Sequence, residues 1–323
     1  MNIDEKRAAQ QLLQAGHVRV ISHASPDGDT LGCASALLRG LAQKGKKILF
    51  ACSDPVPEKF AYLFEGISFS EGEPDFICAV DIADTQLFGK KTAIWADKVD
   101  LCIDHHGTNT GYAIHTLLDS RAAAACEIIY QVLLAMDVTM TPDIAGCLFT
   151  GITTDTGCFR YGNVTPRTHE IAARLMEQGA PAADINRQMF ETKTRARLEI
   201  ERRALDSMEF FCEGRCAVMT ILQKDMWETG ATEDDLDGLP ALPRQIEGVL
   251  AGVCVKEKPD GTAKVSLRTN DPLDAAVLCG RFGGGGHKAA AGCAFHANSG
   301  EEAAALARKE MVQAVQETLE ACP

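Results

Sequence analysis

The chain has 323 residues, of which 46% are hydrophobic and 24% are charged, and its formal net charge is −13. This length exceeds what one hydrophobic core usually organises, so we expect two domains, and the hydrophobic content excludes a disordered chain. The negative charge argues against a protein that coats long duplex nucleic acid, because such binding needs many cations that face the phosphates.

The N-terminal half of the chain alternates short apolar runs with helical patterns. Residues 1–6 lack the apolar core of a signal peptide, and the sequence holds no run of about 18 apolar residues, so we expect a cytoplasmic protein with no membrane partner. A helix is predicted over 30–44, and short buried strands are predicted over 18–22, 47–51, 76–80 and 99–103. Such strands are typical of a parallel sheet covered on both faces, which predicts an α/β domain.

Two further helices have explicit start signals. Thr141 precedes Pro142 and Thr165 precedes Pro166, so each helix is predicted to begin with a capping hydroxyl and a proline at its first position. The segment 192–209 is charged and free of glycine and proline. It is predicted to be a helix that connects two domains.

The C-terminal third predicts a smaller α/β domain. Strands are expected over 216–222 and 249–256, and Asp260-Gly261 is a hairpin turn into a strand over 263–269. A glycine-rich loop and a helix rich in alanine and glutamate follow. The predicted organisation is a first domain over 1–190, a helical connector over 191–212 and a second domain over 213–323.

Polar side chains gather where three predicted strands of the first domain end. They form three clusters, which are His23, Asp27 and Asp29; Asp81 and Asp84; and Asp104, His105 and His106. In a parallel α/β sheet, ligands bind outside the carboxyl ends of the strands. Carboxylates that converge there need compensation by cations.

Asp155 extends this set, because it lies within an otherwise apolar helical stretch that begins at Pro142. An isolated carboxylate would be costly to bury there, and a metal ligand is the better explanation. The candidate ligands offer oxygen or nitrogen donors and no thiolate: His23, Asp27, Asp29, Asp81, His105 and Asp155. Such a set suits Mn²⁺ or Mg²⁺, with manganese favoured by the imidazoles, and can hold two ions if one carboxylate bridges them.

The thirteen cysteines are scattered, mostly in apolar segments, and are predicted to be reduced core residues. Cys212 and Cys216 lack a second pair at the spacing of a zinc site. Cys33 and Cys158 lie near the predicted ligands but have the same core explanation, so no nucleophilic cysteine is predicted.

Taken in order, these motifs resemble those of the DHH-family phosphoesterases: His23-x-x-x-Asp27-x-Asp29, Asp81, Asp104-His105-His106 and Asp155. The run from Gly283 to Gly292 resembles the DHHA1 signature, and the resemblance covers nearly the whole chain. Within that family, the length is most similar to the bifunctional oligoribonucleases that also dephosphorylate 3′-phosphoadenosine 5′-phosphate.

The resemblance implies two manganese ions, with Mg²⁺ as the alternative. One ion would be held by His23 and Asp27, the other by Asp29, His105 and Asp155, and Asp81 would bridge both. Two such ions would activate a water molecule and clamp an in-line displacement at phosphorus, with no covalent enzyme intermediate.

The resemblance also implies two catalytic residues beside the metal ligands. Asp104 would orient an imidazole, as ligating histidines generally require, and His106 would contact the scissile phosphate. Asp84 stands where many relatives carry an amide. If Asp84 joined the ligands, their division between the two ions would change.

The glycine-rich segment of the second domain is predicted to approach an anion through its backbone amides. It is not a P-loop, because His287-Lys288 follows the glycines where that motif needs Gly-Lys-Ser/Thr. By the resemblance, the substrate-binding residues would be Arg268, Gly285, Gly286 and His287, with Lys288 and Arg244 as weaker candidates.

The predicted function is hydrolysis of short oligoribonucleotides to mononucleotides and of 3′-phosphoadenosine 5′-phosphate to AMP. The expected partners are therefore short single-stranded RNA and small nucleotides. The sequence leaves open whether the protein forms a homodimer. Two alternatives also stay open. The first is a phosphodiesterase of linear or cyclic dinucleotides. The second is a non-catalytic nucleotide sensor, which would predict a degenerate ligand set where this one is intact.

Overall fold

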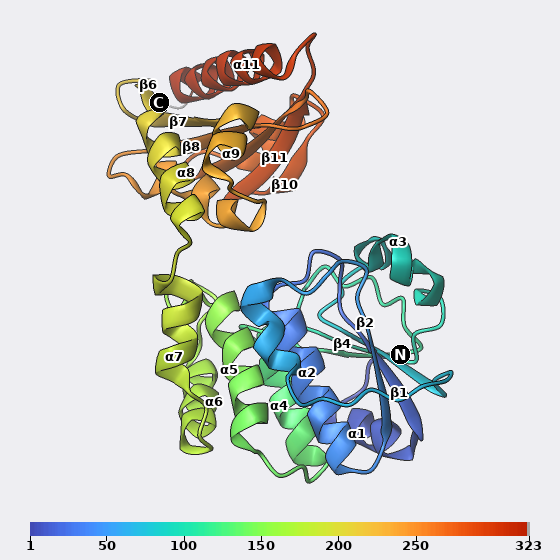
Figure 1. The fold of residues 1–323 in the computed structure, drawn as a ribbon. Helices are drawn as coiled ribbons and strands as arrows, with labels where there is room; N and C mark the ends of the chain where they lie inside the picture. Colours follow the sequence, from blue (N-terminus) through green and yellow to red (C-terminus); the bar gives the residue numbers. More distant parts are fainter. Residues whose placement is uncertain (322–323) are drawn as a thin grey trace. The chain divides into compact units, whose positions relative to one another are not determined.

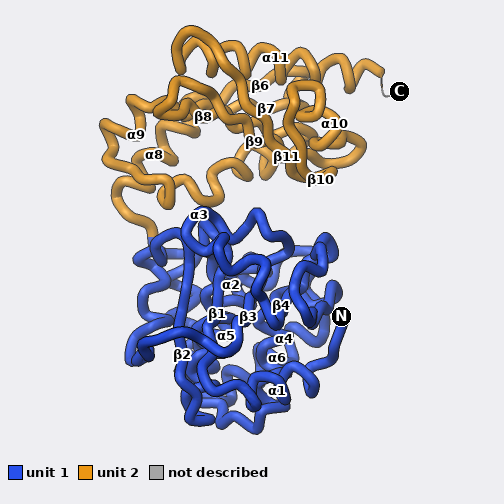
Figure 2. The backbone as a smooth tube through the Cα atoms, turned by 90° about the vertical axis from the view of Figure 1, so that its right-hand side faces the viewer, with its two compact units in different colours: residues 1–192 blue, residues 193–323 orange. Residues whose placement is uncertain are grey.

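The computed structural model describes residues 1–321 and divides into two compact units, Met1–Thr192 and a second that begins at Lys193 (Figure 2). Across the described residues, none of the helices is both long enough and apolar enough to cross a membrane. Each unit has its own hydrophobic core.

Unit 1 is built on a five-stranded sheet in which every neighbouring pair is parallel (Figure 1). The strand order is β2-β1-β3-β4-β5, and the strands are β1 (His17–Ile21), β2 (Lys47–Ala51), β3 (Phe76–Val80), β4 (Leu101–Asp104) and β5 (His115–Leu118). The predicted α/β class with a parallel sheet is confirmed. The sequence prediction missed β5.

The helices of unit 1 are α1 (Glu5–Gln14), α2 (Gly28–Gln43), α3 (Gly89–Thr92), α4 (Ala125–Ala135), α5 (Pro142–Asp155), α6 (Pro166–Glu177) and α7 (Ala182–Asn186). The side chains of Thr141 and Thr165 accept hydrogen bonds from backbone amides in the first turns of α5 and α6, so both predicted start signals are confirmed. The predicted helix over 30–44 begins two residues earlier, at Gly28, because Asp27 caps it.

The sheet of unit 1 is covered on both faces, as its alternating side chains require. Val18 and Val20 point into a large core that includes residues of α1, α2, α4 and α5. Ile21 and Ile77 point into a smaller core on the opposite face, which includes Phe88 from a short 3-10 segment. The largest helices therefore pack on one face.

Unit 2 is a six-stranded mixed sheet in the order β10-β11-β9-β8-β7-β6, in which only β7 and β8 run parallel. The strands are β6 (Glu209–Phe211), β7 (Cys216–Ile221), β8 (Ala251–Glu257), β9 (Ala263–Thr269), β10 (Gly285–His287) and β11 (Ala290–Phe295). The expected glycine-rich loop is thus only partly a loop, because its second half forms β10.

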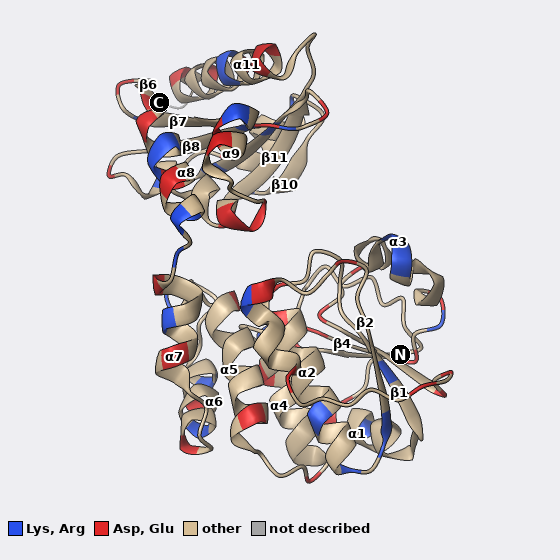
Figure 3. Ribbon diagram, in the orientation of Figure 1, with Lys and Arg blue, Asp and Glu red and all other residues tan. Residues whose placement is uncertain are grey.

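The helices of unit 2 are α8 (Arg195–Asp206), α9 (Gln223–Thr229), α10 (Ala275–Gly280) and α11 (Gly300–Ala321). Residues of α11 pack into the core on one face of the sheet, and residues of α8 pack into a smaller core on the other. Both acidic and basic residues occur on α8 and α9 (Figure 3), and Arg203 of α8 pairs with Asp225 and Glu228 of α9.

Candidate metal centre

Three strands of unit 1 deliver polar side chains to one edge of the sheet. In the parallel register, Ile21 of β1 lies beside Ala79 of β3, and Val80 of β3 lies beside Ile103 of β4. The residues that follow these strand ends must therefore lie close together. They are His23, Asp81, His105 and His106, with Asp104 as the last residue of β4.

Two helices complete the set. Asp27 is the N-cap of α2 and accepts hydrogen bonds from the backbone amides of Asp29 and Thr30, and Asp29 lies in the first turn of that helix. Asp155 is the last residue of α5, which packs against α2. The two helices approach closely at Gly151, where an added Cβ would lie 2.7 Å from Oδ1 of Asp29.

Asp81 lies between two groups of side chains. Its Oδ2 is 3.6 Å from Nε2 of His23, which is also 3.7 Å from Oδ1 of Asp27. Its Oδ1 is 3.6 Å from Nε2 of His105 and 3.5 Å from Nδ1 of His106. One carboxylate thus faces a histidine on each side, which is the position that a bridging ligand occupies.

The second group surrounds His105. Its Nε2 lies 3.5 Å from Oδ2 of Asp155 and 3.9 Å from Oδ2 of Asp29. Three clusters here have ligand atoms within 4.8 Å of one another: His23, Asp27 and Asp81; Asp29, His105 and Asp155; and Asp81, His105 and His106. The structure therefore brings together all six residues that the sequence predicts as metal ligands.

Both candidate histidine ligands are fixed through the ring nitrogen that faces away from the carboxylates. Nδ1 of His23 is 2.7 Å from the carbonyl oxygen of Ala24, and Nδ1 of His105 is 3.2 Å from that of Ala122. A carbonyl can only accept, so each Nδ1 carries the hydrogen. In the neutral rings, Nε2 then presents a lone pair to the carboxylates, as a metal-binding histidine does.

The electrostatics of the cluster call for a cation. Asp29 and Asp81 are only 1% and 3% exposed, and Oδ1 of Asp81 has no hydrogen-bond partner. Burial, followed by the charge of Asp29, raises the pKa of Asp81 well above its usual value, and the same two causes raise the pKa of Asp155 to about 7. Burial alone would lower the pKa of His23, but the adjacent carboxylates of Asp27 and Asp81 raise it to about 11. The raised pKa values keep protons on these side chains, and bound divalent cations would take the place of those protons.

His106 is linked to Asp104. Its Nδ1 lies 2.8 Å from Oδ1 of Asp104, a fully buried carboxylate that also accepts from the backbone amides of His105 and His106. The other oxygen accepts from Nδ2 of Asn109 at 2.6 Å. Asp104 therefore orients the exposed His106, whereas a backbone carbonyl orients the candidate ligand His105. Asn109 was not among the residues predicted from the sequence.

Asp84 lies outside these clusters in the part of the chain that the structure describes. Its Oδ1 accepts from the backbone amide of Gln86 and caps the short 3-10 segment Thr85–Phe88. The concern that Asp84 changes the division of ligands has no geometric support here.

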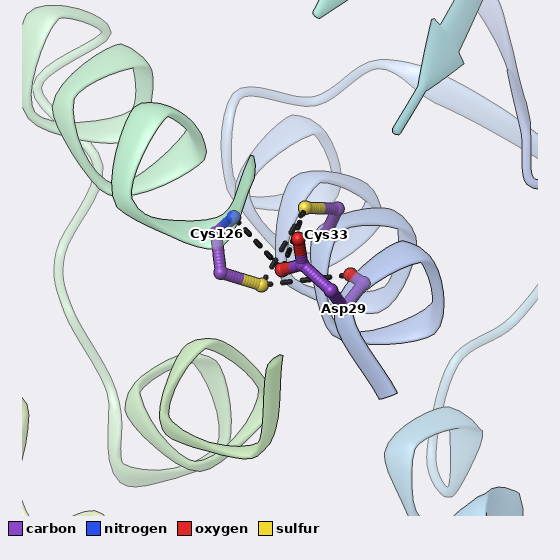
Figure 4. Close-up of side chains that lie close together, drawn as sticks. All are labelled: Asp29, Cys33 and Cys126. Atoms are coloured by element: carbon purple, nitrogen blue, oxygen red, sulfur yellow. Dashed lines mark hydrogen bonds between the residues drawn. The ribbon is translucent and has the colours of Figure 1, made fainter. Parts of the chain in front are cut away.

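Two buried thiols lie behind Asp29 (Figure 4). Sγ of Cys33 on α2 is 3.5 Å from Sγ of Cys126 on α4 and 3.8 Å from Oδ1 of Asp29. Burial raises the pKa of both thiols well above the ordinary value, so they are neutral packing groups, as predicted for Cys33. Cys126 was not singled out in the sequence.

The candidate substrate-binding residues lie in unit 2 on adjacent strands. Ala290 of β11 pairs with Arg268 of β9 on one side and with His287 of β10 on the other. Paired residues point to the same face of a sheet, so the side chains of Arg268 and His287 share a face, about 10 Å apart at their backbones.

Arg244 and Lys288, the weaker candidates, differ in their surroundings. Gly252 of β8 pairs with Arg268, and a Cβ added at Gly252 would lie 2.5 Å from the backbone nitrogen of Arg244. Arg244 therefore lies over β8 on the same face as Arg268. Lys288 instead forms a 2.7 Å ion pair with Asp271.

Different contacts explain why glycine stands at individual positions of the glycine-rich segment. A Cβ at Gly284 would lie 2.2 Å from the carbonyl oxygen of Gly292, and a Cβ at Gly286 would lie 2.6 Å from that of Ala290, so both allow the close approach of β11. Gly285 is exposed and faces open space. Of the two glycines predicted to bind substrate, only Gly285 lacks a structural explanation.

Residues 17–152 match the DHH family, N-terminal domain, and residues 213–320 match the DHHA1 domain. The bifunctional oligoribonuclease and PAP phosphatase NrnA of Thermus thermophilus is 28% identical over 90% of this chain and 88% of its own. The Bacillus subtilis protein of the same name is 25% identical over 85% and 88%.

Among solved structures, an exopolyphosphatase-related protein from Bacteroides fragilis superimposes with a TM-score of 0.86, at 21% identity, over 98% of this chain and 97% of its own. This likeness shows a shared fold over both units. The two domain matches place the chain: the protein belongs to the DHH family, with a DHH N-terminal domain followed by a DHHA1 domain.

Proposed function

We propose that this protein is a two-metal phosphoesterase that hydrolyses short oligoribonucleotides to mononucleotides and 3′-phosphoadenosine 5′-phosphate to AMP. One observation carries the proposal: the Asp81 carboxylate lies between two ligand groups, with one oxygen 3.6 Å from His23 and the other 3.6 Å from His105. The names of the Thermus and Bacillus relatives supply the substrate class.

The proposed ligands are those predicted from the motifs. His23 and Asp27 would hold one ion, Asp29, His105 and Asp155 would hold the other, and Asp81 would be shared by both. Two imidazoles and four carboxylates favour Mn²⁺, with Mg²⁺ as the alternative. When bound, two such ions activate water and stabilise the charge that develops on the phosphate.

His106 is the proposed catalytic residue, and Asp104 positions it. The side chain of His106 is 46% exposed, and its Nδ1 donates to Asp104, so Nε2 is the nitrogen left to meet a substrate. The hydrogen bond to Asp104 raises the pKa of His106. A protonated imidazole can donate a hydrogen bond to a phosphate oxygen and a proton to the departing oxygen.

A protein nucleophile is not needed for this chemistry. The thiols nearest the cluster, Cys33 and Cys126, are fully buried and neutral. Their hydrogen bonds are with Asp29 and with each other, and neither thiol is open to solvent. Water is therefore the proposed nucleophile.

The proposed substrate handle is the face of unit 2 that carries Arg268 and His287, with Gly285 as a backbone contact. Arg244 joins this face over Gly252, and its Nε is a buried donor without a hydrogen-bond partner. Guanidinium groups bind phosphate through paired N–H donors. Such a handle suits small nucleotides and short single-stranded RNA, and the net charge of −13 disfavours long duplexes.

The experiment measures product release from 3′-phosphoadenosine 5′-phosphate and from a 5′-labelled RNA dinucleotide, in Mn²⁺ and then in excess chelator. We expect AMP and mononucleotides in Mn²⁺ only, and neither from the Asp81→Asn variant. Cyclic dinucleotides and pyrophosphate serve as competing substrates. Turnover of a cyclic dinucleotide alone, or no turnover of any substrate by the wild type, would overturn the proposed activity.

A further inference from the structure

A short backbone segment that runs from the loop after β5 into the first turn of α4 touches two of the proposed metal ligands. This segment, Ala122–Cys126, is buried throughout. The carbonyl oxygen of Ala122 accepts from Nδ1 of His105 at 3.2 Å. The backbone amides of Ala125 and Cys126 donate to the carboxylate of Asp29 at 2.6 Å and 3.0 Å, and Figure 4 shows the Cys126 bond. We call this segment the backbone clamp.

Asp29 therefore has a second task. Ala124, the N-cap residue of α4, has no side chain that can accept from the first amides of the helix. The carboxylate of Asp29 takes that place from the neighbouring helix. A carboxylate at a helix N-terminus is stabilised by the exposed amides and the helix dipole, so the clamp holds the Asp29 carboxylate in a fixed orientation.

Asn163 joins a third proposed ligand to the clamp. Its Nδ2 donates to the carbonyl oxygen of Ala123 at 2.9 Å and to that of Asp155 at 3.1 Å. Asp155 is the last residue of α5, where the helix no longer constrains the carbonyl. One amide group thus ties the backbone of Asp155 to the segment that holds Asp29 and His105.

The clamp itself is held from behind by Glu127, a fully buried carboxylate on α4. Its Oε1 accepts from the backbone amide of Ala123 at 3.2 Å and from the hydroxyl of Thr168 at 2.7 Å, and its Oε2 lies 3.2 Å from Nε of Arg167. The clamp is thus fixed on one side by the protein interior. On the other side, Asn163 is the link between it and Asp155.

We propose that Asn163 is a positioning residue for the metal centre, acting on the ion held by Asp29, His105 and Asp155. The inference rests on the proposed function, because it presupposes that these residues bind a divalent cation. The hydrogen bonds of Asn163 are to backbone carbonyl oxygens and not to any of the three side chains. It sets the distance between the end of α5 and the clamp, and so the spacing of the Asp155 carboxylate from the other two ligands.

Asn163 can be tested without damage to the core, because it is exposed. Asn163→Ala removes the amide, and Asn163→Leu removes it while keeping the same number and branching of side-chain heavy atoms. Neither change leaves a buried side-chain cavity, so both variants should fold. Residues that orient metal ligands typically change metal affinity by roughly 10- to 100-fold when they are removed.

Asn186→Ala is the matched control. Oδ1 of Asn186 accepts from the hydroxyl of Thr153 at 2.7 Å, so this variant also removes one asparagine hydrogen bond to α5. It leaves the buried hydroxyl of Thr153 without that partner and should lower the melting temperature of the metal-free protein. The hydrogen bond that this variant removes is to α5 and not to the clamp, so the affinity for Mn²⁺ should stay unchanged.

The experiment titrates each protein with Mn²⁺ and follows the free ion by its electron paramagnetic resonance signal, with thermal melts in chelator alongside. We expect one class of site in both Asn163 variants to weaken roughly 10- to 100-fold, with melting temperatures in chelator equal to the wild type. Unchanged affinities, or equal weakening in Asn186→Ala, would overturn the inference. A wild type that binds no Mn²⁺ would instead overturn the proposed metal centre itself.

Discussion

The Nδ1 nitrogen of His106 lies 2.8 Å from Oδ1 of Asp104, and both residues belong to the motif Asp104-His105-His106. Asp104 is fully buried, whereas His106 is half-exposed at the edge of the metal cluster. We expect His106→Ala to lower kcat by about 10²- to 10⁴-fold at saturating Mn²⁺, because the variant loses a proton donor.

Asp104→Asn should lower kcat by less, because the imidazole remains but its protonated form loses its partner. Steady-state kinetics and Mn²⁺ titration measure both effects.

The control for these variants is Asp84→Asn. Asp84 follows the strand before the motif, but it caps a 3-10 turn and lies outside the ligand clusters among residues 1–321. Its replacement should leave kcat and Mn²⁺ affinity within twofold of the wild type, because surface substitutions usually change free energies by no more than about 0.5 kcal/mol. If Asp84→Asn lost activity as His106→Ala does, Asp84 would belong to the site.

α5 packs so closely on α2 that a substitution expected to stabilise the protein by helix propensity alone should instead destabilise it. Gly151→Ala replaces a glycine inside a helix, which usually stabilises a protein by up to about 1 kcal/mol. Here the new Cβ would lie 2.2 Å from Sγ of Cys126 and 2.7 Å from Oδ1 of Asp29. We expect the variant to lose about 1–3 kcal/mol of unfolding free energy and to bind Mn²⁺ more weakly.

Gly146→Ala is the control in the same helix, since its Cβ would come no closer than 3.4 Å to Pro181. Chemical denaturation of both variants in chelator measures the difference. A Gly151→Ala protein as stable as Gly146→Ala would show that α5 can move away from Asp29 at little cost.

The face of unit 2 that carries Arg268 gives a prediction on substrate binding. Arg268→Ala should raise KM for 3′-phosphoadenosine 5′-phosphate by about 10- to 100-fold with a smaller change in kcat, because a charge-assisted hydrogen bond is lost. Lys288→Ala removes a nearby cation that is already paired with Asp271, and should change KM little. Equal effects of the two changes on KM would indicate a diffuse electrostatic contribution in place of a specific contact.

Much of the metal cluster could be predicted from the sequence, because its residues follow strands and helix starts whose signals are local. Asp81 and His105 are reached by counting from the ends of two apolar runs, and parallel strands bring such ends together. Asp155 was found because a carboxylate interrupts an apolar helix. In each case the informative feature is a polar residue where the pattern predicts burial.

The supporting contacts could not be predicted in this way. Ala122 and Cys126 act through backbone groups, which every residue carries, so their residue types do not indicate these roles. Asn163 is a surface asparagine in a turn, and its bonds to Ala123 and Asp155 depend on a fold that brings distant segments together. Strand β5 was missed because it has only four residues and begins with a histidine.

Asp81 provides a test in which stability and metal binding oppose each other. It is 3% exposed, its Oδ1 lacks a hydrogen-bond partner, and its φ of 59° lies in the left-handed region, which asparagine adopts readily. Asp81→Asn keeps the shape and replaces a buried acidic group, which is costly to ionise there, with a neutral amide, so in chelator we expect the variant to be at least as stable as the wild type. In Mn²⁺ at a hundred times its dissociation constant, the wild type should gain about 2.7 kcal/mol and the variant much less. Denaturation curves with and without Mn²⁺ measure this inversion of order, and equal gains for both proteins would exclude Asp81 as a ligand.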